Sequence, residues 1–292
     1  MEGMHYEGSC IRPPSEARSI LLQVTTGCSH NKCTFCGSYK DKRFRIKEED
    51  LIFRDIRWAA QHGRHYRRLF LMDGDALIIP QKRLVRILEE INRQMPWLER
   101  IGTYANAKSI RKKTPEQLRE LAEKKLGIVY LGMESGDDQV LQAVCKGASA
   151  GEMIDKGRKV RQSGIRLSVT VLLGIAGREG SLRHARATGE ALTEMDPDYV
   201  GALTVMLLPG TPLYEDFQSG VFQLPDEDGI LRELAEMLRH TQLSNGLFVS
   251  NHASNYLPLK VQFPGGKEQG LTQIDRAIQG ETSLKPEWLR AL

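Results

Sequence analysis

Three closely spaced cysteines are the residues of this sequence whose type and spacing most clearly indicate chemistry. Cys28, Cys33 and Cys36 fall within nine residues, on a polar segment that follows the apolar run Ser19 to Thr26. Three thiolates on one loop can bind three irons of a [4Fe–4S] cluster, which leaves the fourth iron open to a small chelating ligand. A zinc site is the alternative, with His30 as a candidate fourth ligand. Simple packing of the three thiols is a third interpretation, which the polar segment disfavours.

Composition narrows the class of protein. The chain has 292 residues, of which 40% are hydrophobic and 27% are charged, as is typical of a globular protein with a sizeable core. Because it shows no secretory leader and no apolar run of the roughly 18 residues that a membrane span needs, we expect a cytoplasmic protein. Two further cysteines, Cys10 and Cys145, bring the total to five, and this odd number disfavours a disulfide framework.

The net charge of the chain indicates less about its function. The 41 Lys and Arg residues exceed the 37 Asp and Glu residues by only four, far from the basic excess of a dedicated nucleic-acid binder. The one local basic concentration lies between Lys40 and Arg68. A solvated helix face with its flanks is the simplest interpretation, and a phosphate-bearing substrate or RNA is the alternative.

Strand-like and helix-like segments alternate along most of the chain. The expected strands are Ser19–Thr26, Arg68–Asp73, Leu98–Tyr104, Gly127–Met133, Arg166–Leu173 and Tyr199–Leu207. The expected helices are Glu48–His62, Gln81–Gln94, one that Thr114 caps, one from Ser149 to Gly164, Leu182–Met195, Asp226–His240 and Leu271–Gln279. This order predicts an α/β fold with a parallel sheet covered by helices. No GxGxxG follows the first strand, which disfavours a Rossmann fold, but the pattern alone leaves a doubly wound sheet and a barrel open.

Polar or glycine-rich motifs follow several of these strands, at the edge where active-site loops of α/β proteins lie. Asp73-Gly74-Asp75 ends the second strand, Glu134-Ser135-Gly136 ends the fourth, and a glycine-rich turn from Gly174 to Gly180 follows the fifth. The stretch Leu208-Pro-Gly-Thr-Pro-Leu-Tyr214 follows the sixth. Taken singly, Asp73-Gly74-Asp75 can also be an ordinary turn.

In their order and placement, the cysteines and these motifs resemble the radical S-adenosylmethionine (SAM) superfamily, over about Ile20 to Gln218. The hallmark of that family is Cys-x₃-Cys-x₂-Cys, and the first spacing here is one residue longer. The resemblance implies a partial (β/α)₆ TIM-type barrel with a C-terminal cap. We therefore expect an N-terminal extension over residues 1–18, the barrel over 19–220, and a cap over 221–292 that is not an independent domain.

The resemblance also implies a [4Fe–4S] cluster on Cys28, Cys33 and Cys36, and a set of contacts to S-adenosylmethionine. Phe35 matches the aromatic residue beside the adenine, and Asp73-Gly74-Asp75 matches the motif that receives the amino group. Further matches in the sequence are Glu134 and Ser135 for the ribose, Lys146 for the carboxylate, Thr170 for the ribose, and Gly174 and Gly177 for close backbone approach to the adenine. Lys146 can instead be a surface lysine.

The expected function is that of a radical SAM enzyme acting on an unidentified substrate, a small molecule in preference to RNA, with an external electron donor of flavodoxin or ferredoxin type. His252 and Tyr256 are candidate catalytic residues in the cap, and Asn251 and Asn255 are candidate substrate contacts; all four can instead be turn residues that bond to the backbone. A zinc- or Fe–S-bearing RNA-binding module and a simple electron carrier are the rival functions.

Overall fold

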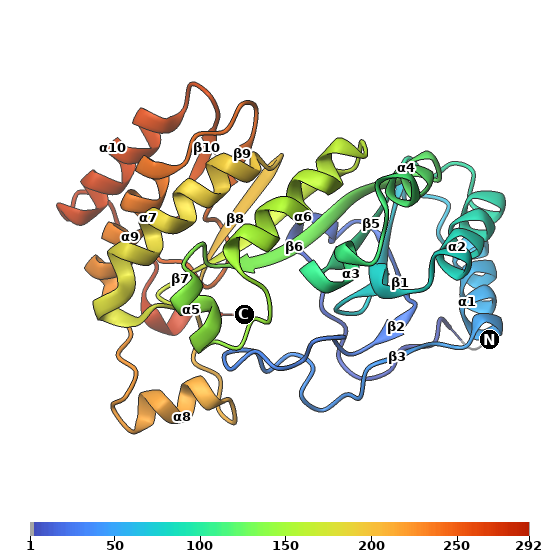
Figure 1. The fold of residues 1–292 in the computed structure, drawn as a ribbon, viewed down its shortest axis with the longest axis horizontal. Helices are drawn as coiled ribbons and strands as arrows, with labels where there is room; N and C mark the ends of the chain where they lie inside the picture. Colours follow the sequence, from blue (N-terminus) through green and yellow to red (C-terminus); the bar gives the residue numbers. More distant parts are fainter. Residues whose placement is uncertain (1–2, 292) are drawn as a thin grey trace. The chain divides into compact units, whose positions relative to one another are not determined.

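The computed structural model describes residues 3–291 of the chain. Its strands are β1 (Ile20–Gln23), β2 (Thr25–Thr26), β3 (Arg45–Ile46), β4 (Arg68–Met72), β5 (Arg100–Ala105), β6 (Leu126–Glu134), β7 (Arg166–Leu173), β8 (Tyr199–Thr204), β9 (Leu247–Val249) and β10 (Lys260–Gln262). Its α-helices are α1 (Glu49–His62), α2 (Gln81–Gln94), α3 (Ala107–Arg111), α4 (Pro115–Glu123), α5 (Asp138–Ala143), α6 (Ala150–Gln162), α7 (Gly177–Met195), α8 (Pro212–Gln218), α9 (Glu227–His240) and α10 (Lys267–Ile278). Figure 1 labels these elements along the ribbon.

The chain divides into two compact units. The first contains Met1–Asn31, Ser38–Leu131 and Lys159–Leu167, and the second contains Lys32–Gly37, Gly132–Arg158 and Ser168–Leu292. The boundary between them passes through the cysteine segment, so that Cys28 belongs to the first unit and Cys33 and Cys36 belong to the second.

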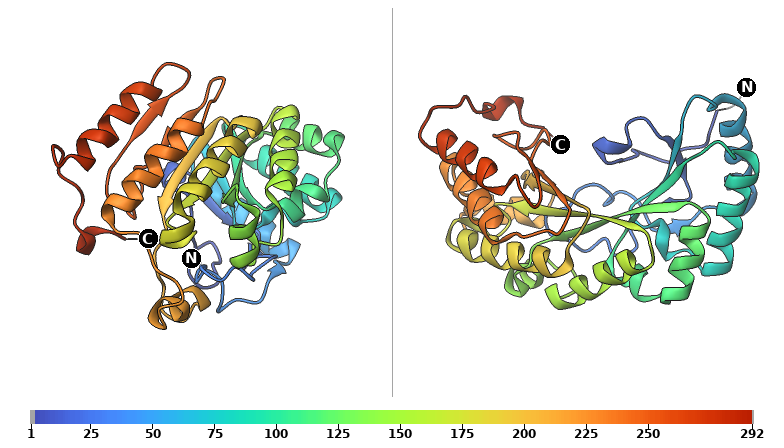
Figure 2. Two further views of the ribbon diagram at one scale, coloured as in Figure 1. Left: turned by 60° about the vertical axis from the view of Figure 1, so that its left-hand side comes forward. Right: turned by 90° about the horizontal axis from the view of Figure 1, so that it is seen from above.

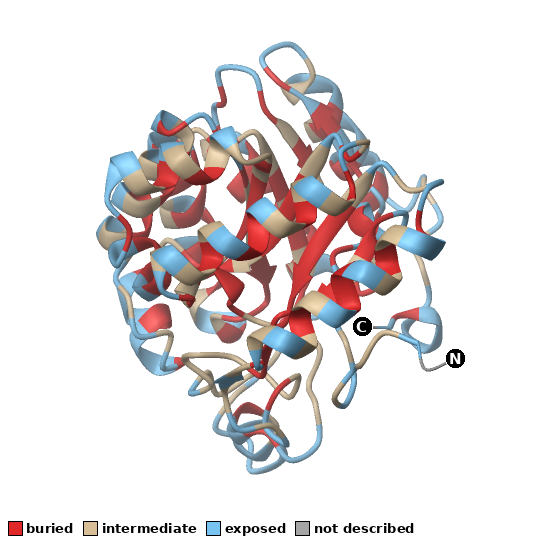
Figure 3. Ribbon diagram, turned by 90° about the vertical axis from the view of Figure 1, so that its right-hand side faces the viewer, coloured by how far each residue is buried: buried red, intermediate tan, exposed pale blue. Residues whose placement is uncertain are grey.

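The first unit is built on parallel strands. β1 pairs with β4, β4 with β5, and β5 with β6, in registers such as Leu22↔Leu71 and Leu71↔Thr103. Parallel strands are covered on both faces and therefore read as apolar runs, and β4 is buried along almost its whole length. The amphipathic helix α1 packs on β1 and on α2, through buried residues that include Ile52 and Ile56. Figure 3 shows the result as helices with a buried side and an exposed side.

The second unit also contains parallel strands, but its last strand is antiparallel. β7 pairs in parallel with β8, and β8 with β9, whereas β10 runs antiparallel to β9. Helix α9 packs along α7, and α10 packs on α9; Figures 1 and 2 show the three helices as neighbours, from yellow to red. The side of α9 that faces this layer carries buried residues such as Ile230, Leu234 and Leu238. The segment expected to be a cap thus contributes two strands and two long helices to this unit.

Most expected elements are confirmed, and the differences have local causes. The capping box at Thr114 is present, with Thr114 Oγ1 accepting from Gln117 N at 3.2 Å. Helix α7 begins at Gly177, five residues earlier than expected, because most of the glycine-rich turn after β7 is helical. The short elements β9, β10, α3, α5 and α8 were not expected, since segments of three to seven residues carry too little periodicity.

Among residues 3–291, none of the helices combines the length and apolarity of a membrane-spanning segment.

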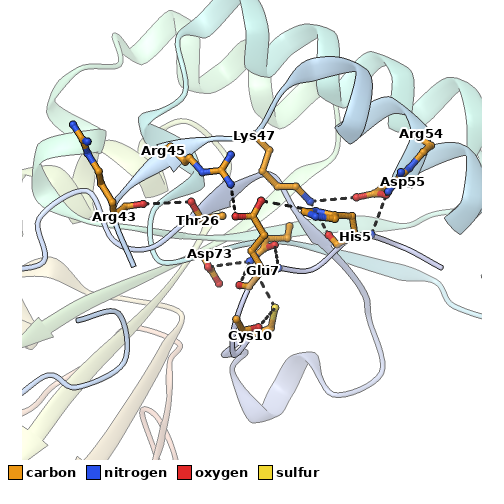
Figure 4. A network of polar contacts seen from close by, with 12 residues as sticks. His5, Glu7, Cys10, Thr26, Arg43, Arg45, Lys47, Arg54, Asp55 and Asp73 are labelled. Carbon is orange, nitrogen blue, oxygen red and sulfur yellow. Dashed lines mark hydrogen bonds and ion pairs between the residues drawn. The ribbon is translucent and has the colours of Figure 1, made fainter. Parts of the chain in front are cut away.

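The segment before β1 is attached to the rest of the first unit by polar contacts (Figure 4). Lys47 is completely buried, donates to His5 O at 2.7 Å and forms an ion pair with Asp55 at 3.3 Å. Gln23 at the end of β1 exchanges two hydrogen bonds with the backbone of Glu7, at 2.9 and 3.1 Å. Part of the basic stretch is therefore structural, since Lys47 holds the N-terminal segment and does not belong to a solvated face.

Candidate functional site

In the first unit, two aspartates hold the loop that contains Cys28. Asp73 is fully buried, and its Oδ2 accepts from Gly27 N at 3.2 Å and from Gln23 Nε2 at 3.1 Å. Lys42 Nζ lies 3.5 Å from the same oxygen. Asp75 is also fully buried, and its Oδ2 accepts from Ser29 Oγ and from Asn106 Nδ2. The residues on both sides of Cys28 are therefore anchored to the segment after β4.

Each of these two aspartates keeps one carboxylate oxygen without a protein partner. Asp73 Oδ1 and Asp75 Oδ1 are buried and accept no hydrogen bond of good geometry among the described residues, although the Ser109 hydroxyl lies close enough to Asp75 to lower its pKa. Burial raises the pKa of Asp75 to about 6, and it also raises the pKa of Asp73 despite the nearby Lys42. A buried carboxylate oxygen without a partner is energetically costly, and a cationic or hydrogen-bond-donating ligand removes that cost.

Gly74, between the two aspartates, lies against the cysteine loop. A Cβ built on Gly74 would be 3.1 Å from Cys28 Cβ and 2.8 Å from the ring of Tyr39. Any larger residue would therefore displace the loop or the ring. The structure thus brings together Cys28 and the whole Asp73-Gly74-Asp75 motif within one unit.

In the second unit, the segment with Cys33, Phe35 and Cys36 is fixed by two neighbours. Thr34 N donates to Val144 O at 3.1 Å, at the end of α5, and Leu213 N of α8 donates to Thr34 O at 3.1 Å. Phe35 is half-buried and packs against an apolar cluster formed by Val140, Val144, Leu172, Ile175, Val205 and Leu213. The aromatic ring is therefore part of the layer at the end of β7, where the glycine turn begins.

The Glu134-Ser135-Gly136 turn lies in the same unit and carries an ion pair. Glu134 adopts a left-handed backbone conformation with φ of 69°, and its Oε1 lies 2.8 Å from Lys146 Nζ. Ser135 is fully buried, and its hydroxyl contacts His184 Nδ1 at 2.7 Å and accepts from Asp137 N at 2.9 Å. The Ser135 hydroxyl is thus occupied within the protein, and Glu134 is a buried carboxylate whose Oε1 is paired with Lys146.

The other residues predicted to contact the cofactor also lie in the second unit, and they are Thr170, Gly174 and Gly177. Thr170 is half-buried on β7 opposite Gly201 of β8. Gly174 and Gly177 both have left-handed backbones, with φ of 81° and 68°. Gly174 N donates to the buried carboxyl of Glu233 at 2.6 Å.

The candidate residues of the C-terminal segment bond mainly to other residues of the second unit. Tyr256 is buried, and its hydroxyl donates to Glu287 at 2.7 Å and accepts from Arg290, whose guanidinium stacks on the Tyr256 ring at 4.1 Å. Asn255 is buried between Thr204 and the carbonyl of Ala202. His252 is half-buried beside Ser254, and burial lowers its pKa, whereas Asn251 is exposed.

Sequence reasoning missed the buried polar residues behind the motifs, chiefly His184, Thr188 and Glu233. The structure shows His184 completely buried, with both ring nitrogens hydrogen-bonded. One signal was available: Ser181, His184 and Thr188 recur at the spacing of a single helix face.

Comparison with known proteins agrees with this architecture. Residues 22–184 match the sequence model of the Radical SAM superfamily, which is more than half of the chain. The protein therefore belongs to the radical SAM superfamily, whose members are enzymes. One relative is the Uncharacterized protein MJ0486 of Methanocaldococcus jannaschii, 21% identical over 76% of this chain and 71% of the relative.

Solved structures of radical SAM enzymes share the fold. Methylornithine synthase (PylB) superposes with a TM-score of 0.53 at 19% identity, over 77% of this chain and 63% of PylB. The methyltransferase TsrM from Kitasatospora setae gives 0.55 at 20% identity, over 71% and 41%. Coproporphyrinogen III oxidase (HemN) from Escherichia coli gives 0.50 at 12% identity, over 90% and 52%. The chain spans less than two thirds of each of these proteins, and the likeness confirms the expected α/β fold class of radical SAM type.

Proposed function

We propose that Cys28, Cys33 and Cys36 bind a [4Fe–4S] cluster and that the motifs after β4, β6 and β7 bind SAM. Membership of the radical SAM superfamily supports this assignment. When bound, the cluster and SAM supply reductive cleavage of SAM to a 5′-deoxyadenosyl radical, which abstracts hydrogen from the substrate. The task of the protein is to orient the bound groups and to exclude water from them.

The observation that carries the proposal is the pair of unpartnered carboxylate oxygens beside the Cys28 loop. The α-amino group of SAM is a cation with three N–H donors, and Asp73 Oδ1 and Asp75 Oδ1 are buried acceptors that lack a donor. A cation there would favour the ionised form of both carboxyls and would lower the raised pKa of Asp75. The residues present thus fit the group that the family requires.

The second unit contains the other residues that we propose to contact SAM. Glu134 can accept from the ribose hydroxyls, because a carboxylate has more acceptor sites than its single bond to Lys146 uses. Lys146 can pair with the carboxylate of SAM, and Phe35 offers an aromatic surface for the adenine. Thr170 lies within β7, and Gly174 and Gly177 follow that strand. The Ser135 hydroxyl is bonded to His184 and holds the Glu134-Ser135-Gly136 turn.

We further propose that the substrate is a small molecule and that the electron comes from an external carrier of flavodoxin or ferredoxin type.

His252 is the stronger of the two candidate catalytic residues, because its ring is only half-buried and its pKa is lowered by burial, so that it is neutral near pH 7. The Tyr256 hydroxyl is held by Glu287 and Arg290, and burial raises its pKa to about 12.

The test is anaerobic reconstitution with iron and sulfide, followed by reduction with dithionite and quantification of 5′-deoxyadenosine. We expect the wild-type protein to take up a [4Fe–4S] cluster and to form 5′-deoxyadenosine from SAM. Each of Cys28→Ala, Cys33→Ala and Cys36→Ala should lose both, whereas the matched controls Cys10→Ala and Cys145→Ala should retain both. A Glu134→Ala variant should keep the cluster and bind SAM more weakly.

Other outcomes would favour the rival functions. A protein that binds zinc, takes up no cluster and binds RNA with a steep salt dependence would be an RNA-binding module. A cluster-loaded protein whose reduced cluster gives the same EPR signal with and without SAM would be an electron carrier. Retention of the cluster in Cys33→Ala would contradict the ligand assignment.

A further inference from the structure

A completely buried carboxyl lies behind the glycine turn of the second unit. Glu233 belongs to α9, outside the residues 22–184 that match the family, and none of its surface is exposed. Its Oε1 accepts from Gly174 N at 2.6 Å, and its Oε2 accepts from the Ser181 hydroxyl of α7. The backbone of Gly174 is left-handed, and a Cβ there would lie 2.9 Å from Ile230. The Glu233 carboxyl therefore accepts a hydrogen bond from Gly174 N. Neighbouring side chains leave no room for a Cβ at this turn.

A buried histidine connects the same helix to the second motif. His184 follows Ser181 by one turn of α7, and its Nε2 lies 3.1 Å from Leu172 O and 3.5 Å from Glu233 Oε1. Because a carbonyl oxygen only accepts, Nε2 carries the hydrogen and Nδ1 accepts from the Ser135 hydroxyl at 2.7 Å. Burial lowers the pKa of His184 to about 4, which agrees with a neutral ring.

A third contact completes the attachment of the Glu134-Ser135-Gly136 turn to α7. Gly136 N donates to Thr188 Oγ1 at 2.8 Å, one turn beyond His184. The turn after β6 is thus bonded to one face of α7, and Glu233 of α9 links the Gly174 turn after β7 to Ser181 on the same helix. Burying a carboxyl and an imidazole in an apolar layer costs free energy that apolar side chains would not incur. Here the Glu233 carboxyl orients the N–H of Gly174, and the His184 ring orients the hydroxyl of Ser135.

We propose that Glu233 and His184 are positioning residues, which hold the Gly174 turn and the Glu134-Ser135-Gly136 turn in the conformation that binds SAM. The inference rests on the proposed function and extends it, because it makes α9 in the C-terminal segment a determinant of cofactor affinity. The two residues act through the backbone of Gly174 and the hydroxyl of Ser135, and neither is assigned a contact with SAM.

The test compares SAM affinity with protein stability in the cluster-reconstituted protein. Glu233→Ala leaves Gly174 N and the Ser181 hydroxyl without a partner, so we expect the Kd for SAM to rise about 10-fold or more at unchanged iron content. Glu233→Gln keeps a carbonyl oxygen for Gly174 N and an amide for Ser181, and should bind within about 3-fold of wild type. Glu236→Ala is the matched control on the same helix, because Glu236 pairs with Arg186 away from the turns, and it should leave the Kd unchanged.

A purely structural role gives a different pattern, in which Glu233→Ala lowers the melting temperature and binds SAM as wild type does; that result would overturn the inference. If Glu233→Ala does not fold, Ser181→Ala removes one hydroxyl beside Glu233 and should still weaken SAM binding measurably. A wild-type protein that carries the cluster but binds no SAM would overturn the proposed function itself. Failure of the inference and failure of the function are therefore distinguishable.

Discussion

A buried carboxyl and a buried imidazole in the second unit respond to pH in opposite directions. Burial raises the pKa of Glu233 from its ordinary 4.5 to about 7, and lowers the pKa of His184 from 6.5 to about 4. The folded protein therefore holds more protons at Glu233 than the unfolded chain between about pH 4.5 and 7, and the stability from this group is lost as pH rises through that window. At His184 the folded protein holds fewer protons, so that its contribution is lost as pH falls from about 6.5 to 4.

This difference predicts the pH dependence of one variant. Glu233→Gln cannot ionise, so its free energy of unfolding should rise relative to wild type between about pH 5 and 8, by an amount on the order of 2–3 kcal/mol. Urea unfolding in steps of pH measures the difference. In the control Glu90→Gln on α2 the difference should stay flat over this range, because hydrogen bonds from Arg93 hold the pKa of Glu90 below its ordinary value. A flat difference for Glu233→Gln would contradict the prediction.

At the scale of elements, helix α7 determines how the turn after β6 is held. A Cβ built on Gly136 would lie 2.7 Å from Thr188 Cα and would overlap the backbone of Ala187. Backbone atoms in the middle of a 19-residue helix cannot move as a flexible side chain can. The glycine of this motif is therefore required by packing against α7, independently of any contact with a ligand.

A pair of Gly→Ala variants tests this packing. Gly136→Ala should destabilise the protein by about 2 kcal/mol or more, because the added methyl group must displace backbone. Gly151→Ala is the control within α6, where a Cβ would meet nothing within 4 Å, and it should stabilise the protein by roughly 0.5–1 kcal/mol. Denaturant unfolding of both variants gives the comparison, and a Gly136→Ala variant as stable as wild type would disprove the packing argument.

At the scale of the whole molecule, the C-terminal segment is integral to the second unit. β9 pairs with β8 through Val200↔Phe248, and α9 covers α7 with buried residues that include Leu231 and Met237. Removal of residues 221–292 would expose the buried face of α7 and one edge of β8. Apolar surface exposed on this scale outweighs the net stability of a typical domain.

We therefore expect a truncated chain of residues 1–220 to be insoluble or to lack cooperative unfolding. A chain of residues 1–280 keeps β9, α9, β10 and α10 and serves as the control, with a cooperative thermal transition below that of the full chain because the contacts of Arg290 are lost. Differential scanning calorimetry distinguishes these outcomes. Cooperative unfolding of residues 1–220 would show instead that the C-terminal segment is a dispensable addition.

The sequence by itself determined the periodic elements and indicated the family. The strand expected at Arg166–Leu173 is the observed β7, and the helix expected at Gln81–Gln94 is the observed α2, because apolar periodicity is a local property of the chain. The cysteine spacing and the motifs at strand ends likewise indicated the family, which the comparison with known proteins confirms. Their roles in binding the cluster and SAM remain predictions.

Only the tertiary structure decided which polar groups are left without a partner and which are already used. The sequence placed Asp73 and Asp75 in a motif at a strand end, but only the fold shows that one buried oxygen of each lacks a hydrogen bond of good geometry, whereas the Ser135 hydroxyl is bonded to His184. Glu233 contacts Gly174 across 59 residues of chain. The physical reason is that burial and hydrogen bonding depend on segments far apart in sequence, so that no local pattern can record which of these side chains will meet.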